Sequence, residues 1–335
     1  MNKIVPLLFA IVFLFTSCNG TERNIFLTKN NCIKNEIKGD TIKAVKVLSS
    51  DTLLLSIDDI LLFNNLILVE CLEQSTFIFN IFDLCGNKIS AFGKIGRAEN
   101  EFSDGTGLCG QYDFKTIVVN DVNSAAIKFI DIQSSIESNQ CIVSNKKPTS
   151  QRVLNASVIK DSLMVFEQET LDNYELVIRS IDNRKNNKQI ELYKPTNNPF
   201  SKYRSFMKAN SEKQIIALAM SRMNQVNFLS LESGQRSSCS LYQEPTYPDK
   251  NDDKKMVYYC DIAASDNFVY ALYMNQTYNE SYEVEKPMEI HVFTWDGCFY
   301  KKICVNESIC RLSVDSNDKI MIARDINDNV YKYYL

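Results

Sequence analysis

The sequence predicts an all-β fold in which one small sheet is repeated six times around an axis, and three observations support this. First, a strand pattern of apolar, polar, variable and apolar residues occurs six times, first at residues 79–82 and last at 330–333. Second, each copy is preceded by another apolar strand, and the repeats recur at intervals of roughly 40 to 64 residues. Third, Gly86, Gly234 and Gly297 fall between the third and fourth strands of a repeat, where a tight hairpin requires positive φ. Four short strands per repeat predict a six-bladed β-propeller with four-stranded antiparallel blades.

The ring requires a strand from the N-terminal part of the chain. The last repeat lacks its fourth strand, because the chain stops at Leu335 directly after the third. An unpaired sheet edge favours aggregation, so natural proteins cover it. The alternating segment Thr41 to Leu48 belongs to no repeat, and we expect it to supply the outer strand of the last blade. Residues 211–223 fit a helix or a blade strand equally well.

The N-terminus has the pattern of a bacterial lipoprotein signal. Lys3 precedes an apolar run at residues 4–15 that is too short to cross a bilayer comfortably, and Thr16 and Ser17 precede Cys18. We expect a signal peptide at 1–17, lipidation of Cys18, a flexible tether at 18–40 and one propeller domain at 41–335. The alternative is an ordinary secretory signal with a coincidental cysteine. The expected protein is exported, attached to a membrane only through its lipid, and outer-membrane or periplasm-facing.

Composition excludes some functions. Lys and Arg total 37 against 41 Asp and Glu, which gives a net charge of -4. The sequence has no block of basic residues that could bind along a nucleic-acid backbone. We therefore expect no nucleic-acid partner, and a monomer. Ten of the 11 cysteines remain once Cys18 is set aside, an even number that permits disulfides in an exported protein. Six are scattered singly through strand-like segments, and we expect most of these to be small buried apolar side chains: Cys71, Cys85, Cys109, Cys141, Cys239 and Cys260. The chain has one histidine and no CxxC pair, so the evenly spaced Cys298, Cys304 and Cys310 do not predict a zinc site.

The segment at residues 93–102, GKIGRAENEF, resembles the signature G-x-x-G-x-G-P-x-E-F of the TolB-like six-bladed β-propeller lipoproteins of Gram-negative anaerobes. Residues 268–273 and 293–297 are similar to two further patches of that family. The resemblance implies the propeller fold and an envelope location, but no defined chemistry. Gly93, Gly96, Glu101 and Phe102 match the signature, whereas residues 98–100, Ala-Glu-Asn, stand where the family tends to have Gly-Pro-Gly.

Two loops are candidates for a ligand or partner site. In a propeller, loops between the second and third strands, and loops joining one blade to the next, emerge on the same face. Residues 93–104 and the enlarged 275–289 connection are such loops. A binding face with both charge signs and aromatic rings would use these residues: Lys94, Arg97, Glu101, Tyr273, Tyr278, Tyr282 and Glu283. A solvated insertion is equally compatible. For Glu101 we prefer a structural role, in which its carboxylate accepts N–H bonds from its own loop.

Catalytic groups are sparse. His291 has no evident nucleophile near it in sequence, and the Asp-rich segments 315–318 and 325–328 fit hairpin turns better than calcium loops. Asn120, Asp121, Asp261 or Glu70 would converge at the channel mouth if the protein were similar to calcium-dependent lactonases. The hypothesis we favour is a non-enzymatic binding or scaffold module for an envelope protein or glycan, without a cofactor. The alternative is a calcium-assisted hydrolase or lyase.

Overall fold

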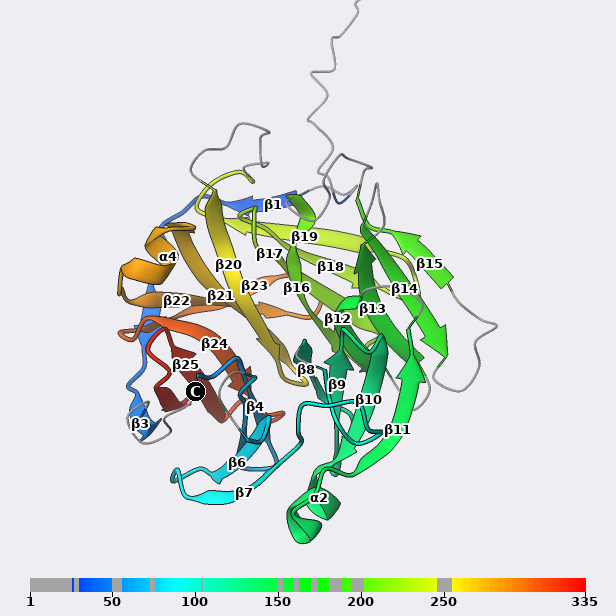
Figure 1. The fold of residues 1–335 in the computed structure, drawn as a ribbon. Coiled ribbons are helices and arrows are strands. Elements are labelled where there is room, and N and C mark those ends of the chain that lie inside the picture. Colours follow the sequence, from blue (N-terminus) through cyan, green and yellow to red (C-terminus); the bar gives the residue numbers. More distant parts are fainter. Residues whose placement is uncertain are drawn as a thin grey trace, which may run out of the picture.

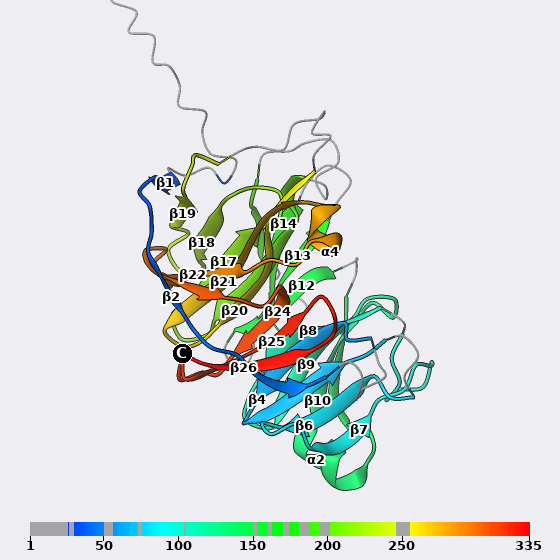
Figure 2. The same cartoon turned by 90° about the vertical axis from the view of Figure 1, so that its left-hand side faces the viewer.

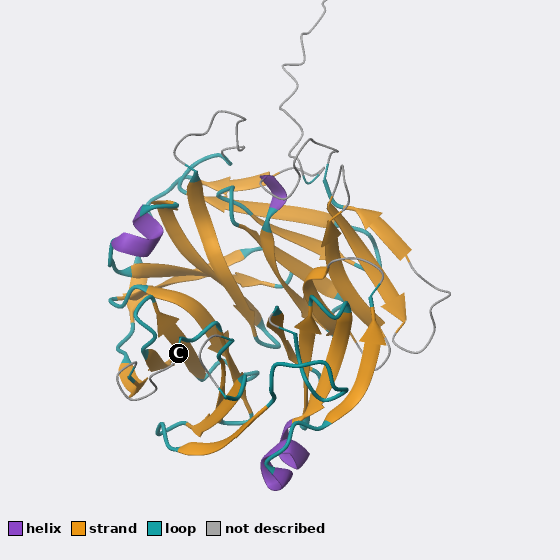
Figure 3. Cartoon of the chain, in the orientation of Figure 1, coloured by secondary structure: helices purple, strands orange, loops and turns teal. Residues whose placement is uncertain are grey.

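The fold was obtained as a computed structural model, which describes residues 26, 30–49, 56–72, 76–103, 105–149, 153–159, 163–169, 174–180, 188–193, 202–245 and 255–335. The predicted signal peptide and the predicted lipidation site at Cys18 lie outside these residues. The described strands form six sheets arranged around a central axis (Figure 1). Strands dominate, with short helices only at the periphery (Figure 3). The six-bladed all-β propeller predicted from the repeat is therefore confirmed.

Blades 1 to 3 each arrange four antiparallel strands in chain order from the axis outward. Blade 1 comprises β4 Asp59–Phe63, β5 Leu66–Glu70, β6 Phe79–Asp83 and β7 Lys88–Phe92. Blade 2 comprises β8 Thr106–Gln111, β9 Thr116–Asp121, β10 Ala126–Asp131 and β11 Val143–Pro148, with helix α2 Ile132–Ser138 before β11. Blade 3 comprises β12 Val153–Ile159, β13 Leu163–Glu169, β14 Tyr174–Ser180 and β15 Lys188–Glu191.

Blades 4 to 6 follow the same order, and each receives one strand from the N-terminal part of the chain. Blade 4 comprises β16 Ser205–Asn210, β17 Ile215–Met220, β18 Val226–Ser230 and β19 Arg236–Leu241. Blade 5 comprises β20 Met256–Ala264, β21 Phe268–Thr277, β22 Met288–Thr294 and β23 Phe299–Val305, with helix α4 Glu280–Glu283 after β21. Blade 6 comprises β24 Ile309–Val314, β25 Ile320–Asp325 and β26 Val330–Tyr334. The ambiguous segment 211–223 thus contains β17 and no described helix.

The N-terminal strands close the ring and also correct two expectations. β3 Val45–Leu48 pairs antiparallel with β26 and completes blade 6, as predicted. Thr41, however, belongs to β2 Gly39–Thr41, which pairs parallel with β23 of blade 5. Residues 42–44 cross from blade 5 to blade 6, with Ile42 and Ala44 packed against the core. The alternating pattern at 41–48 therefore covers the end of β2, this crossing and β3, and not one strand. β1 Asn30–Ile33 pairs parallel with β19, so the expected tether is already part of the fold from Asn30.

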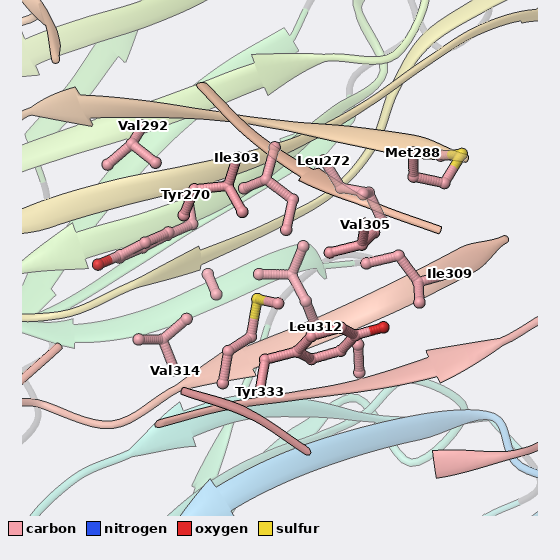
Figure 4. Packing of buried hydrophobic residues seen from close by; sticks show 14 of the residues in the cluster. Tyr270, Leu272, Met288, Val292, Ile303, Val305, Ile309, Leu312, Val314 and Tyr333 are labelled. Atoms are coloured by element: carbon pink, nitrogen blue, oxygen red, sulfur yellow. The ribbon is translucent and has the colours of Figure 1, made fainter. Parts of the chain in front are cut away.

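The blades pack face to face through apolar side chains. Between blades 5 and 6, Tyr270, Leu272 and Val292 meet Leu312 and Tyr333 in one buried cluster (Figure 4). Each fully buried Leu or Phe contributes about 1.5–3 kcal/mol, so these interfaces rather than single contacts hold the ring together. The three glycines predicted at hairpins all have positive φ: 88° at Gly86, 71° at Gly234 and 87° at Gly297.

Helix α2 was not predicted. Its N-cap is Asp131, whose side chain accepts a hydrogen bond from Ser134 N, and Asn139 ends it with a φ of 52°. These capping residues are visible in the sequence, but seven residues carry too little apolar periodicity to reveal a helix. Within the described residues, no helix is long and apolar enough to cross a membrane.

The described cysteines form no disulfide with one another, and Cys71, Cys109, Cys141, Cys239 and Cys260 are buried. These five agree with the expectation of small buried apolar side chains, whereas Cys85 is exposed and does not; Cys298 is exposed as well. The described residues also contain no group of three or more side chains suited to a metal ion.

Candidate binding face and central channel

The two candidate loops lie on one face of the ring, as the connectivity predicted. Residues 93–103 join β7 of blade 1 to β8 of blade 2, and residues 278–287 join the second and third strands of blade 5. We call the side carrying these two segments the loop face. Third strands end on the opposite face, and the C-terminus directly follows the third strand of blade 6. Figure 2 accordingly shows α4 on one side of the ring and the C-terminus on the other.

The first loop is folded on itself around Glu101. The Glu101 carboxylate accepts a hydrogen bond from Ala98 N at 2.8 Å. A Cβ on Gly96 would lie 2.0 Å from Glu101 Oε2, so only glycine leaves room for this carboxylate. The preferred structural role of Glu101 is therefore confirmed. Ala98 has no positive φ, so the departure from Gly-Pro-Gly is compatible with the loop.

A buried ion pair on the inner side of the same loop holds its backbone in place. Lys128 and Asp121, 2% and 0% exposed, place Nζ and Oδ2 2.8 Å apart. Lys128 also donates to Glu101 O and lies 4.4 Å above the Phe102 ring centroid, while Ser103 donates through both N and Oγ to Asp121. Burial alone would raise the pKa of Asp121, but the hydrogen bonds from Lys128 and Ser103 lower it below its usual value. The loop backbone is thus fixed, and its outward side chains Lys94, Ile95 and Arg97 are exposed.

The second loop has a different construction. β21 extends to Thr277, whose N and hydroxyl both donate to Glu280 Oε2, at 2.9 and 2.7 Å, at the start of α4. Tyr278 is 47% exposed, and Tyr282 and Glu283 lie within α4. At its far end, Asn327 donates to Glu285 across to blade 6 at 2.7 Å. A cavity of about 330 Å³ lies at this end of the loop, between the loop and blade 6.

Tyr273 does not belong to the exposed face, contrary to prediction. It is 7% exposed and stacks on His291 with ring centroids 4.4 Å apart. The reason is that β21 is longer than expected, which places Tyr273 inside the blade rather than in the loop.

The single histidine sits in a buried network. His291 Nδ1 lies 3.0 Å from the Tyr259 hydroxyl, and Nε2 lies 3.3 Å from Glu289 Oε2. Glu289 also accepts from Tyr242 at 2.5 Å and from Lys302 at 3.1 Å. The hydrogen bond from His291, with those from Tyr242 and Lys302, lowers the pKa of Glu289 to about 2, and burial lowers the pKa of His291. Because His291 is enclosed, this network fixes the contact between blades 4 and 5 and offers no imidazole to a ligand.

A cavity of about 530 Å³ follows the ring axis and is lined by the innermost strand of every blade. Glu212 and Asp266 also line this cavity. The lining charges that act on one another are those of Asp59, Asp261, Arg311 and Lys208, from blades 1, 5, 6 and 4 respectively. We call this group the channel quartet. Arg311 Nε lies 3.9 Å from Asp59 Oδ1, and Asp261 accepts from Leu312 N at 2.7 Å.

Burial shifts the titration of these groups. It raises the pKa of Asp59 and raises that of Asp261 to about 6, while Arg311 and Lys208 oppose both shifts. For Arg311, burial is outweighed by Asp261 and Asp59, which raise its pKa. Burial and Asp59 raise the pKa of Glu70, beside the channel, to about 8. Arg311 and Lys208 thus lie among carboxyl groups whose pKa burial raises.

The predicted convergence of Asn120, Asp121 and Asp261 does not occur. Asn120 and Asp261 line the channel, where Asn120 donates to Val153 O at 3.0 Å. Asp121, the next residue of β9, points the opposite way, to Lys128. Adjacent strand residues face opposite sides of a sheet, so the two cannot share one ligand. This donor set does not fit a calcium ion, and Arg311 would repel one.

Of the channel quartet, the sequence analysis predicted only Asp261, although the sequence contains a signal for two of the others. Asp59, Asp261 and Arg311 each directly precede an apolar residue of an innermost strand, Ile60, Ile262 or Leu312. Aligning the first strands of the repeats, rather than the third, would have placed these three charges at one level of the axis.

Comparisons with known proteins agree with this fold. Residues 38–317 match the family described as TolB-like 6-blade propeller-like. A crystal structure of a DUF4221 family member from Bacteroides vulgatus ATCC 8482 is similar, with a TM-score of 0.57 and 14% identity, covering 89% of this chain and 99% of that one.

A "putative exported protein" from Bacteroides fragilis NCTC 9343 is similar with a TM-score of 0.52 and 10% identity, covering 91% of this chain and 98% of that one. None of the curated proteins matches. With the matched region spanning most of the chain and six blades in the structure, the protein belongs to the TolB-like six-blade propeller family.

Proposed function

We propose that this protein is a lipid-anchored module of the cell envelope that binds a protein or glycan partner through its loop face, without catalysing a reaction. The observation that carries the proposal is the arrangement of the face itself. A fixed loop presents Lys94, Ile95 and Arg97, a separate loop presents Tyr278, and a polar channel runs through the ring that carries both. Cations, apolar side chains and a tyrosine are groups that recur in recognition surfaces.

The chemistry of the channel supports binding rather than catalysis. The single imidazole of the chain is held by Tyr259 and Glu289, away from the channel lining. Burial raises the pKa of the channel thiol of Cys109 to about 12, so it is not a thiolate at neutral pH. The channel quartet combines two acidic and two basic side chains, and such a mixed set of charges is suited to orienting a polar ligand.

Two observations support an envelope location. The pattern at residues 3–18 is that of a lipoprotein signal. A structurally similar Bacteroides fragilis protein is described as exported. Lipidation of Cys18 and the membrane leaflet are part of the proposal.

The loop face is tested with charge and aromatic variants of the full chain. The variant Lys94→Glu/Arg97→Glu/Tyr278→Ala changes only side chains that project outward. Its matched control is Phe114→Ala, because Phe114 is 70% exposed and lies on a β8–β9 connection, which emerges on the opposite face. We expect binding to a glycan array, or to cross-linked envelope proteins, to fall at least tenfold in the triple variant only. Equal binding by the triple variant and wild type would refute the proposed face.

The calcium-assisted hydrolase or lyase remains the competing proposal, and metal analysis separates the two. A stoichiometric divalent ion in the purified protein, lost on Asp261→Asn substitution, would favour the enzyme. We expect no such ion, because Asp121 is turned away from the channel and the Arg311 guanidinium is part of the channel lining.

A further inference from the structure

The chain is pinned to the ring long before the expected start of the domain. Phe26 is 0% exposed and packs in the cluster between blades 3 and 4, with its ring centroid 5.9 Å from that of Tyr193. The Arg236 guanidinium lies 5.3 Å from the Phe26 ring centroid and donates to Phe26 O at 3.3 Å. The same guanidinium donates to Glu191 O and Leu192 O of blade 3. Phe26 is therefore fixed at the outer junction of blades 3 and 4.

This contact limits how far the lipid can lie from the ring. Cys18 and Phe26 are 26 minus 18, or eight, residues apart. Eight fully extended residues span at most about 29 Å. The expected start at residue 41 would have left 23 residues, with a reach of about 80 Å. A domain of this size has a radius of gyration of about 19 Å and is about 50 Å across, so the shorter tether cannot bring the lipid to the opposite rim and favours the rim beside Phe26 as the side nearest the membrane.

We propose that the rim formed by blades 3 and 4 faces the phospholipid surface, which holds the propeller edge-on to the membrane. This inference rests on the lipidation of Cys18 that belongs to the proposed function. Blades 1 and 6, opposite blades 4 and 3 in the ring, then face away from the bilayer. The channel axis lies closer to the membrane plane than to its normal, so the loop face opens sideways, toward partners in the same membrane or beside it.

The orientation is measured by energy transfer in proteoliposomes. A fluorescent amino acid is placed in the full, lipidated chain at exposed positions on the near rim, Gln189 of β15 or Ser233 of the β18–β19 turn, or on the far rim at Ile89 of β7, which is 44% exposed. Vesicles of phosphatidylethanolamine and phosphatidylglycerol carry a rhodamine acceptor on the headgroup. We expect transfer from either near position to exceed transfer from Ile89 at least twofold.

Two further variants test the cause. Insertion of 20 Gly and Ser residues after Glu22 lengthens the tether without touching the ring, and Phe26→Ala removes the pin. Both are expected to reduce the difference between the rims, the insertion most strongly. A difference that survives the insertion would show that some other surface holds the protein, and equal transfer from all three positions in the parent chain would overturn the orientation.

Acylation is measured separately, so that the two proposals fail in different ways. Mass spectrometry of the parent chain and of Cys18→Ser reports the lipid. An acylated chain with equal transfer from both rims overturns the edge-on orientation and leaves the anchor intact. A chain without acyl groups overturns the anchor, and with it the orientation.

Discussion

The two loops of the loop face are built in opposite ways. In residues 93–103, Phe102 is fully buried, Glu101 accepts from its own loop, and Lys128 and Asp121 fix the backbone from below. In residues 278–287, Tyr278 and Val284 are about half exposed, and hydrogen bonds join the loop to its own ends and to blade 6. The segment that matches the family signature is thus a structural clasp between blades 1 and 2.

The largest effect is expected at the ion pair beneath the clasp. Lys128→Met leaves Asp121 buried and uncompensated, which typically costs about 3–5 kcal/mol of unfolding free energy. Urea unfolding at pH 7 measures the loss. Lys128→Met/Asp121→Asn should cost less than the sum of the two single variants, because neither charge is then left alone. Additive losses would show that the pair does not interact.

The next effect concerns the space beside Glu101. Gly96→Ala places a methyl group 2.0 Å from Glu101 Oε2, so the carboxylate must move, at a cost of about 1–3 kcal/mol. The same substitution in a Glu101→Ala background should cost clearly less in urea unfolding. An equal cost in both backgrounds would place the strain elsewhere in the loop.

The unfolding free energy is expected to depend on pH through Glu70, which contacts the first residue of β8 after the clasp. Glu70 accepts a hydrogen bond from Thr106 at 2.7 Å, and burial raises its pKa from 4.5 to about 8. Between these values the folded protein keeps a proton that the unfolded chain releases, so stability contributed by this group falls as pH rises from 4.5 to 8. The decline is about 1 kcal/mol per pH unit. Glu70→Gln should flatten the decline in urea unfolding measured at pH 5, 6.5 and 8, and an unchanged slope would contradict the assignment.

The smallest effect on stability is expected in the second loop. Tyr278→Ala removes a side chain that is 47% exposed, and such surface changes shift the unfolding free energy by about 0.5 kcal/mol or less. Its effect should appear in partner binding instead. A stability loss as large as that of Gly96→Ala would remove the contrast between the loops.

Local patterns were enough to predict the repeated strands, three of the hairpin turns and the strand that closes the ring. The six strand patterns, the hairpin glycines and the closing strand near Val45 follow from alternation and turn chemistry, which act within a few residues. The face carrying both loops followed from connectivity. Tyr273 was misplaced because strand ends depend on packing. Asp121 was misplaced although alternation alone separates it from Asn120, the preceding residue of the same strand β9.

The sequence by itself determined the repeat, the number of blades and the need for an N-terminal strand at the end of the ring. Only the tertiary structure decided that Asp59, Lys208, Asp261 and Arg311 meet on the axis, because they lie far apart along the chain on four different blades. It also decided that Phe26 is inserted between blades 3 and 4, since an isolated phenylalanine carries no periodicity and its burial depends on a pocket built by Tyr193 and Arg236.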